Sequence, residues 1–420
     1  MKVGVVGGGA AGLVTAWLLE RDHAVTLFER SARLGGHADT VEVEHDGRRI
    51  AVESGIEFFW DAGYPTFLRL LRALGIATRK YPVSVSLGAA GAERVRLIPP
   101  FRGGVSPLNG MTPAALYELL AFKYVLWRGA GIVRRGDTAE TIGDFLRRVR
   151  TPPGIERTLV RPIMQAAWGA PRATFDSFSA YNVLSYFPSG SIASLGVPVM
   201  REIPDGVGAY IAALTGALGR TTVRRSAEIV AVAREGSAYR VHSADGTTDC
   251  FDHVVFATNA RDALRLLPPG SELDAARTAL DGFKYFTAEV AVHGDERLMP
   301  ARRSHWSMVN IRYNGEMSQC TIWKGRRGDP PLFRSWIDGA HEPPAPLYRV
   351  TTYEHPWVEP DHFAAQARLA PLQGAANLWH AGVHTQGIDC HESAVASAAR
   401  VARRLAPGAA RLRELDRGRA

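Results

Sequence analysis

The chain begins with an apolar segment that runs directly into a glycine cluster, KVGVVGGGAAG at residues 2–12. Gly7, Gly9 and Gly12 have the spacing G-x-G-x-x-G. Between a strand and a helix, the first glycine permits a tight turn and the second lets the backbone approach a pyrophosphate closely. The third lets the helix pack tightly on the strand, and the amides that begin the helix bind phosphate oxygens. These features predict a dinucleotide-binding βαβ unit, without specifying the dinucleotide.

A carboxylate and a second glycine pair narrow the choice of cofactor. Residues 13–23 have the apolar spacing of a helix, and residues 24–30 read as a second strand. Glu29 ends that strand, where a carboxylate accepts hydrogen bonds from the adenosine ribose and disfavours the 2′-phosphate of NADP. Gly35 and Gly36 then let a second loop pass close to the pyrophosphate. A surface acid and an ordinary glycine turn are the alternatives, but the combination favours FAD over NAD.

Length and cysteine usage limit the class of protein. A chain of 420 residues is too long for one small core and suggests more than one lobe. No apolar run approaches the roughly 18 residues of a membrane span, and the early glycine cluster leaves no room for a signal peptide. Cys250, Cys320 and Cys390 are far apart. We therefore expect a cytoplasmic protein with neither a disulfide framework nor a metal site.

The charge balance is basic, with a formal net charge of +8 that comes mostly from arginine. A solvated surface explains it, and so would an acidic substrate, an acyl carrier or a membrane surface. Because no long basic block is interleaved with aromatic residues, we expect no binding to nucleic acid.

Hairpins, helices and strands are predicted for most of the remaining chain. Period-two alternation on both sides of Asp46-Gly47 predicts a β-hairpin. The Arg-rich residues after Pro407 are expected to form a loosely held tail. The other expected segments are a helix at 64–75, a hairpin at 81–98, helices within 99–200, α/β structure over 201–270, and strands within 284–360.

Several stretches together resemble the flavin-containing amine oxidoreductase superfamily. Within it, the chain is most similar to the bacterial group of predicted NAD/FAD-binding proteins. More distant relatives are monoamine oxidases, carotenoid desaturases and flavin-dependent fatty-acid double-bond isomerases. The resemblance rests on residues 2–13, 27–50, 254–268, 352–357 and 378–398, and on the Tyr64-Pro65 turn.

The resemblance implies an α/β fold with a Rossmann-like FAD-binding domain of the glutathione-reductase type. A substrate domain of antiparallel sheet plus helices is inserted into it. The implied division is 1–90, 201–270 and 371–406 for FAD binding, 91–200 and 271–370 for substrate binding, and 407–420 as the tail.

FAD is expected to bind non-covalently. In the family, a hydrophobic residue contacts the adenine through its backbone, and here Ile229 or Val230 would be that residue. The expected FAD contacts are Gly7, Gly9, Ala10, Ala11, Gly12, Glu29, Arg30, Gly35, Gly36, His37, Gly55, Ile56, Glu57, Ile229, Val230, Thr258, Gly382, Val383 and His391.

The C-terminal stretch LWHAGVHTQGIDCHESAV carries the second flavin motif, a strand, a glycine loop and a helix from about His391. In the family this helix points its N-terminus at the N1–C2=O edge of the isoalloxazine, where its dipole stabilises reduced flavin. Many relatives have an acidic residue where this chain has Val383, and His384 or Gln386 would replace it.

The candidate catalytic residues are His391, Glu392 and His384. Histidine suits proton transfer because its pKa lies near neutrality. The alternative for the first turn of this helix is capping, to which Glu392 and Ser393 are suited.

Five aromatic residues are candidates to line an apolar substrate site, with burial in a helical or aromatic core as the alternative. They are Phe59, Trp60, Trp168, Tyr181 and Tyr186. No motif specifies the substrate or the oligomeric state.

The leading hypothesis is an FAD-dependent oxidoreductase that takes a hydride from a hydrophobic small molecule to flavin N5. This would be a dehydrogenation or desaturation of a lipid-like or secondary-metabolite substrate, which is either carrier-bound or membrane-derived. The alternatives are a redox-neutral double-bond isomerase, an amine oxidase, or a binding protein without catalysis. An amine oxidase of this superfamily usually uses a lysine-bound water, and only Lys284 and Lys324 lie in plausible positions.

Overall fold

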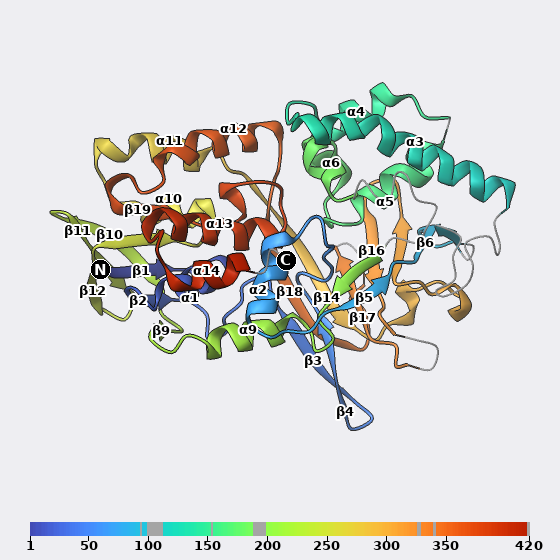
Figure 1. Cartoon of the computed structure of the whole chain (residues 1–420). Coiled ribbons are helices and arrows are strands. Elements are labelled where there is room, and N and C mark those ends of the chain that lie inside the picture. The colour runs from blue at the N-terminus through green and yellow to red at the C-terminus, as the bar shows by residue number, and fades with distance from the viewer. Residues whose placement is uncertain are drawn as a thin grey trace.

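The computed structural model describes residues 1–92, 95–98, 112–152, 154–187, 199–325, 329–338 and 342–417. Figure 1 shows two halves side by side. One contains a parallel sheet with β1 and the helices α1, α13 and α14 close to it, so segments from both the first and the last part of the sequence lie in this half. The other contains a large sheet with the helices α3 to α6 above it in this view.

A five-stranded parallel sheet in the order β19-β13-β1-β2-β9 organises the first half. Its strands are short and mostly apolar, as expected for a sheet buried on both faces. A three-stranded antiparallel meander accompanies it. The strands are β1 (Lys2–Val6), β2 (Ala24–Phe28), β9 (Thr222–Arg224), β13 (His253–Phe256) and β19 (Leu378–His380), with β10 (Ile229–Glu235), β11 (Ala238–Ser243) and β12 (Thr248–Phe251) in the meander.

Helices cover this sheet. All ten residues of α1 are buried, because α1 packs against β1 and β2 of the sheet and against α9, α13 and α14. A Cβ on Gly12 would lie 1.8 Å from the carbonyl oxygen of Gly7, so only glycine allows α1 to sit this close to β1. The helices are α1 (Ala10–Leu19), α2 (Pro65–Ala73), α9 (Val207–Gly216), α10 (Ala260–Leu266), α11 (Asp274–Asp281), α12 (Pro360–Leu369), α13 (His391–Leu405) and α14 (Ala410–Arg417).

The second half contains a seven-stranded sheet in the order β18-β14-β17-β16-β15-β6-β7. All its pairings are antiparallel except that of β15 with β6. Together with the parallel sheet, it confirms the predicted fold class. The strands are β6 (Val85–Ala89), β7 (Arg96–Ile98), β14 (Tyr285–His293), β15 (Val309–Tyr313), β16 (Ser318–Ile322), β17 (Phe333–Ile337) and β18 (Leu347–Pro356).

Two smaller pairings connect these sheets. The Asp46-Gly47 hairpin forms as predicted, with both turn residues at positive φ. The hairpin expected over 81–98 is shorter, because only β6 and β7 pair with each other and the preceding strand pairs elsewhere. The strands are β3 (Thr40–His45) with β4 (Arg48–Glu53), and β5 (Arg79–Pro82) with β8 (Val199–Glu202).

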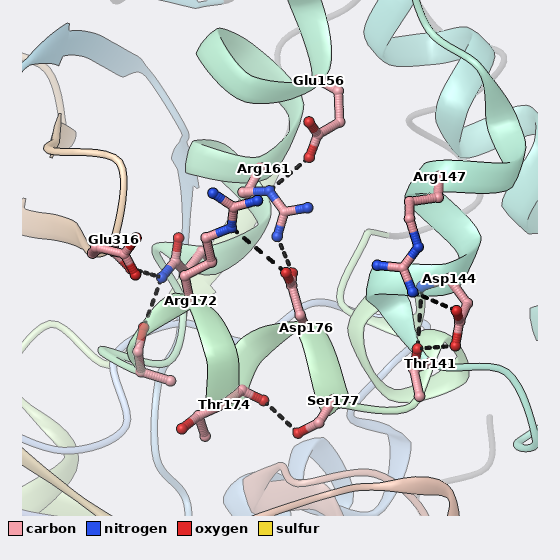
Figure 2. Close-up of polar contacts among 12 residues, drawn as sticks. Thr141, Asp144, Arg147, Glu156, Arg161, Arg172, Thr174, Asp176, Ser177 and Glu316 are labelled. Atoms are coloured by element: carbon pink, nitrogen blue, oxygen red, sulfur yellow. Dashed lines mark hydrogen bonds and ion pairs between the residues drawn. The ribbon is translucent and has the colours of Figure 1, made fainter.

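A helical layer packs on the seven-stranded sheet. Figure 2 shows its central ionic contact, in which the buried guanidinium of Arg161 pairs with both Glu156 and Asp176. Arg172 stands one turn before Asp176 in α6, and its guanidinium lies 3.6 Å from the Asp176 carboxylate. The layer consists of α3 (Pro113–Arg135), α4 (Ile142–Val149), a π-helical turn (Glu156–Val160), α5 (Arg161–Gln165), α6 (Arg172–Ser177) and α7 (Ala180–Ser185).

The C-terminal segment differs from the expected loose tail. Residues 410–417 form α14, whose Leu412 and Leu415 are buried against α1 and α2. Arg411 is also buried and pairs with the buried Glu20 at 2.9 Å. The arginine content of this segment suggested solvation, whereas the helical spacing of its two leucines was the informative signal.

We predict that Leu415→Ala lowers the free energy of unfolding by about 2–5 kcal/mol, because it leaves a cavity in a packed core. Chemical denaturation followed by circular dichroism measures the loss. Leu347→Ala is the matched control, since Leu347 is 43% exposed. Equal stability of the two variants would contradict the docking of α14.

Candidate active site

Two glycine loops meet at the carboxyl edge of the parallel sheet. Gly9 and Gly35 form a parallel bridge, and the Gly35 amide donates to the carbonyl of Gly8 at 2.9 Å. The nearest atom to a Cβ on Gly9 would be the Gly36 Cα, 3.9 Å away. Gly36 is itself exposed. The two loops therefore present bare backbone to the same side.

The start of α1 adds a positive dipole end to this bare backbone. Gly9 is the N-cap and supplies no side-chain hydrogen bond, and the first turn contains no acidic residue. The amides that begin such a helix are therefore left for a ligand. An unfilled backbone surface beside an uncapped helix N-terminus fits a pyrophosphate.

Glu29 is held beside the first glycine loop by two amides. One carboxylate oxygen accepts from the Gly8 amide at 2.7 Å and the other from the Ser31 amide at 2.8 Å. This fixes the carboxylate at the end of β2, where the ribose is expected. The neighbouring Arg30 is exposed and lies 3.6 Å from Asp262.

The structure distinguishes the two adenine candidates at the start of β10. A bulge interrupts the β10–β11 ladder between Ile229 and Ala231, so Val230 has no partner in that ladder. Ile229 is buried, whereas Val230 is 45% exposed. Val230 is therefore the more accessible of the two residues, and its backbone is not used in the ladder.

Two further predicted contacts lie at the same sheet edge. Gly382 follows β19 with φ 138° and donates its amide to Ser397 of α13 at 2.8 Å. A Cβ on Gly382 would lie 3.5 Å from the Thr258 carbonyl, after β13. A Cβ on Gly7 would meet the Ala257 carbonyl at 2.7 Å. Val383 is half-buried.

The loop after β4 packs on His37, which directly follows the second glycine pair. The Ile56 amide donates to the His37 carbonyl at 3.1 Å, and a Cβ on Gly55 would lie only 1.7 Å from that oxygen. The His37 ring stacks on Tyr353 of β18 at 4.8 Å, yet His37 remains exposed. The predicted contacts His37, Gly55 and Ile56 thus meet where the two halves join.

His391 and Glu392 begin α13 and both contact other helices. The His391 Nε2 lies 2.7 Å from the Tyr210 hydroxyl, and burial lowers the pKa of His391 to about 3, so the ring is neutral near pH 7. The Glu392 carboxylate accepts from the amides of Thr66 and Phe67 at 2.9 and 2.8 Å. Glu392 therefore caps α2 rather than its own helix.

The third candidate catalytic residue, His384, lies among buried histidines. His384 is 1% exposed, and its ring contacts the Phe283 ring edge-on at 5.3 Å. Burial and the neighbouring His380 and His362 hold its pKa well below the ordinary value. Burial also lowers the pKa of His380 to about 4, and that of His362 to about 4.

Three of the five predicted substrate residues come together, and we call them the aromatic cluster: Trp60, Trp168 and Tyr186. The Tyr186 ring lies 6.1 Å from that of Trp60 and 4.8 Å from that of Trp168. Its hydroxyl donates to the backbone carbonyl of Asp389, just before α13. The cluster therefore links the helical layer to the approach to α13.

The other two predicted substrate residues lie elsewhere. Phe59 is fully buried and packs on Tyr64 and Phe67 in the core beneath α2. Tyr181 packs on Phe363 of α12 at 5.6 Å.

An ionic cluster that the sequence did not predict forms around Lys324. The Lys324 ammonium lies 3.1 Å from Glu57 and 3.4 Å from Glu202, and 4.9 Å from the centre of the Phe58 ring. One Glu57 oxygen is buried with no hydrogen-bond partner in the described part of the chain. Glu57 and Lys324 are far apart in sequence, so no spacing could have joined them.

Charge and burial oppose each other in this cluster. Burial lowers the pKa of Lys324, but Glu57, Glu53 and Glu202 more than offset it, so the pKa is raised overall. Burial raises the pKa of Glu53 to about 7, although Lys324 opposes this rise. The other lysine noted from the sequence, Lys284, is exposed and pairs with Glu359 at 2.8 Å.

These features define a dinucleotide-binding fold joined to a second half that is built on a mostly antiparallel sheet. Residues 10–297 match the family described as flavin containing amine oxidoreductase, which is more than half of the chain. The chain belongs to that family, and the predicted class of flavin-dependent oxidoreductase is confirmed.

Three solved structures with related activities in their names share the fold. A CLA-producing fatty acid isomerase from P. acnes is 16% identical, with a TM-score of 0.67 over 96% of this chain and 98% of that one. Cyclohexylamine oxidase from Brevibacterium oxydans IH-35A is 15% identical, with a TM-score of 0.66 over 96% and 99%. Putrescine oxidase bound to putrescine is 13% identical, with a TM-score of 0.66 over 96% and 99%. No curated protein matches the chain.

We predict that the free energy of unfolding falls as pH drops from about 6.5 towards 4. The buried His380 stays neutral in the folded state down to its pKa of about 4, whereas the unfolded chain binds a proton near pH 6.5. Folding therefore loses stability in that window. His380→Leu should reduce the slope by about 1.4 kcal/mol per pH unit.

Urea denaturation at a series of pH values measures this slope. His45→Leu is the matched control, because the His45 side chain is 36% exposed on the β3–β4 hairpin. An unchanged slope in His380→Leu would show that folding does not lower the pKa of His380.

Proposed function

We propose that the flavin is FAD, bound non-covalently along the carboxyl edge of the parallel sheet. The two bare glycine loops and the start of α1 would hold its pyrophosphate, Glu29 its ribose, and the backbone of Val230 its adenine. Gly382 and the start of α13 would lie along the flavin end. The spacing of these groups along one edge supports an extended dinucleotide.

We propose further that the protein dehydrogenates or desaturates a hydrophobic small molecule. Bound FAD supplies hydride acceptance at N5. The observation that carries the proposal is the aromatic cluster, whose half-buried Tyr186 joins the buried Trp60 and Trp168 to the approach to α13. His391 is neutral at physiological pH, so in this proposal it contributes a hydrogen bond rather than a positive charge.

Two alternative reactions suit the same fold. An isomerase would return the hydride to the substrate, and the name of the P. acnes neighbour records such a reaction class for that protein. An amine oxidase is suggested by the cyclohexylamine and putrescine oxidase neighbours. Lys324 is the lysine that would serve it, but its ammonium already contacts Glu57 and Glu202. A non-catalytic binding protein is disfavoured because both glycine loops are complete.

The domain boundaries stay a prediction. We propose that 1–90, 201–270 and 371–406 form the FAD-binding part, and that 91–200 and 271–370 form the substrate-binding part. A cytoplasmic location also stays a prediction. No helix in the described part of the chain has the length and apolarity needed to cross a membrane.

We predict that Gly9→Asp abolishes FAD binding, because a carboxylate would occupy the bare backbone surface and repel the pyrophosphate. Flavin absorbance of the purified protein and its titration with FAD measure the effect. Gly219→Asp is the matched control, since a Cβ there meets nothing within 4 Å. Stoichiometric flavin in Gly9→Asp would refute the placement.

Anaerobic mixing with a panel of fatty acids, terpenoids, polyketides and amines tests the reaction. We expect a hydrophobic non-amine to bleach the flavin absorbance and to yield a product with two fewer hydrogens. Product of unchanged mass, without net reduction, would establish the isomerase alternative. Bleaching by amines alone would establish the amine oxidase alternative.

A further inference from the structure

The outer face of α3 exposes an unusual amount of apolar surface. Five of the eleven large hydrophobic side chains that are exposed in the described part of the chain lie on this one helix. At about 100° per residue, all five fall within an arc of roughly 100°. They are Leu116, Tyr117, Leu120, Tyr124 and Trp127, with exposures of 42%, 50%, 53%, 37% and 63%. We call them the α3 outer face.

Packing fixes the orientation of this face. The opposite side of α3 contains the buried Ala121, Val125 and Leu126. A Cβ on Gly129 would lie 2.7 Å from Leu184 of α7, so α3 already packs there as closely as the backbone allows. The α3 outer face therefore cannot turn inward to bury its side chains. Figure 1 shows α3 on the outside of the helical layer.

The helix is well formed along its length. Thr112 caps its start by accepting from the Ala115 amide at 3.1 Å, and Gly136 ends it at φ 63°. Arg96 pairs with Glu118 of α3 and also donates to the Thr158 carbonyl at 2.6 Å. These contacts attach α3 to the rest of the layer as a rigid element.

Positive charge borders the α3 outer face. The helix carries four basic residues and one acidic residue, Glu118, which Arg96 already neutralises. By helical spacing, Lys123 and Arg128 stand at the two edges of the apolar arc. Arg128 donates to the Tyr124 hydroxyl at 2.9 Å. Arg134 and Arg135, both exposed, follow along the helix, and Arg135 lies 3.8 Å from the Asp137 carboxylate.

We propose that the α3 outer face docks this protein on the surface of a bilayer that contains anionic phospholipid. Trp127, Tyr117 and Tyr124 have the amphipathic rings that settle among lipid headgroups, and the leucines enter the acyl boundary. The basic residues attract anionic headgroups. This inference goes beyond the proposed function and does not depend on which molecule the flavin oxidises.

A second copy of the chain fits the same face less well. A two-fold contact through α3 would bring the same positive border from each copy together, which repels. An anionic bilayer instead offers opposite charge and an apolar interior. Interfacial binding, rather than insertion, agrees with the finding that no described helix could cross a membrane.

Co-sedimentation of the purified, flavin-loaded protein with vesicles tests this proposal. We expect binding to vesicles of phosphatidylcholine mixed with phosphatidylglycerol, weak binding to pure phosphatidylcholine, and loss of binding at high salt. The double variant Leu120→Ser, Trp127→Ser should weaken binding by about tenfold or more. The matched control is Leu347→Ser, Tyr348→Ser, which removes two exposed apolar side chains from β18.

A variant with reversed charge tests the electrostatic part of the proposal independently. Arg128→Glu with Arg134→Glu should also weaken binding, with flavin content and thermal unfolding unchanged because both residues are exposed. Failure of the wild-type protein to bind anionic vesicles would overturn the proposal. Equal binding by the Leu120/Trp127 variant would do so too. A wild-type dimer that these substitutions dissociate, without vesicle binding, would identify the face as an interface between copies.

Discussion

The close backbone approach of two glycine loops is the constraint on which the nucleotide-binding half depends. Gly12 lets α1 pack against the carbonyl of Gly7, and Gly9 pairs with Gly35 in a parallel β-bridge. Any side chain larger than hydrogen at Gly12 would push α1 off β1. The carboxyl edge of the sheet, the uncapped helix start and the carboxylate of Glu29 are then presented together, and the proposed pyrophosphate and ribose contacts follow from that arrangement.

A single buried carboxylate joins this half to the second sheet. Asp39 follows the second glycine pair and is 1% exposed. It accepts from the Ser54 hydroxyl at 2.8 Å and from the Tyr353 hydroxyl at 3.3 Å, and it pairs with Arg349 of β18. Hydrogen bonds to a charged, buried acceptor are among the stronger ones in proteins. The loop that would lie along the pyrophosphate is thus attached directly to the sheet that would face the substrate.

The features that could be predicted from the sequence depend on residues close together in the chain. The glycine motifs, the Asp46-Gly47 hairpin and the start of α13 at His391 are all local patterns, and all are found. Contacts between distant segments were not predictable. Glu392 reads as a residue capping its own helix, but its carboxylate caps α2, because tertiary packing decides which amides lie nearest. Glu57 and Lys324 likewise meet only through the fold, and the roles of the predicted site residues stay predictions.

The parallel sheet is assembled from both ends of the chain, and this affects biosynthesis. β1 spans Lys2–Val6, whereas β19 begins only at Leu378 and α13 at His391. Until α13 has been synthesised, α1 lacks this packing partner, although every residue of α1 is buried in the finished protein. A nascent chain of this protein therefore exposes apolar surface on α1 until α13 has been synthesised, and such transiently exposed surface favours aggregation.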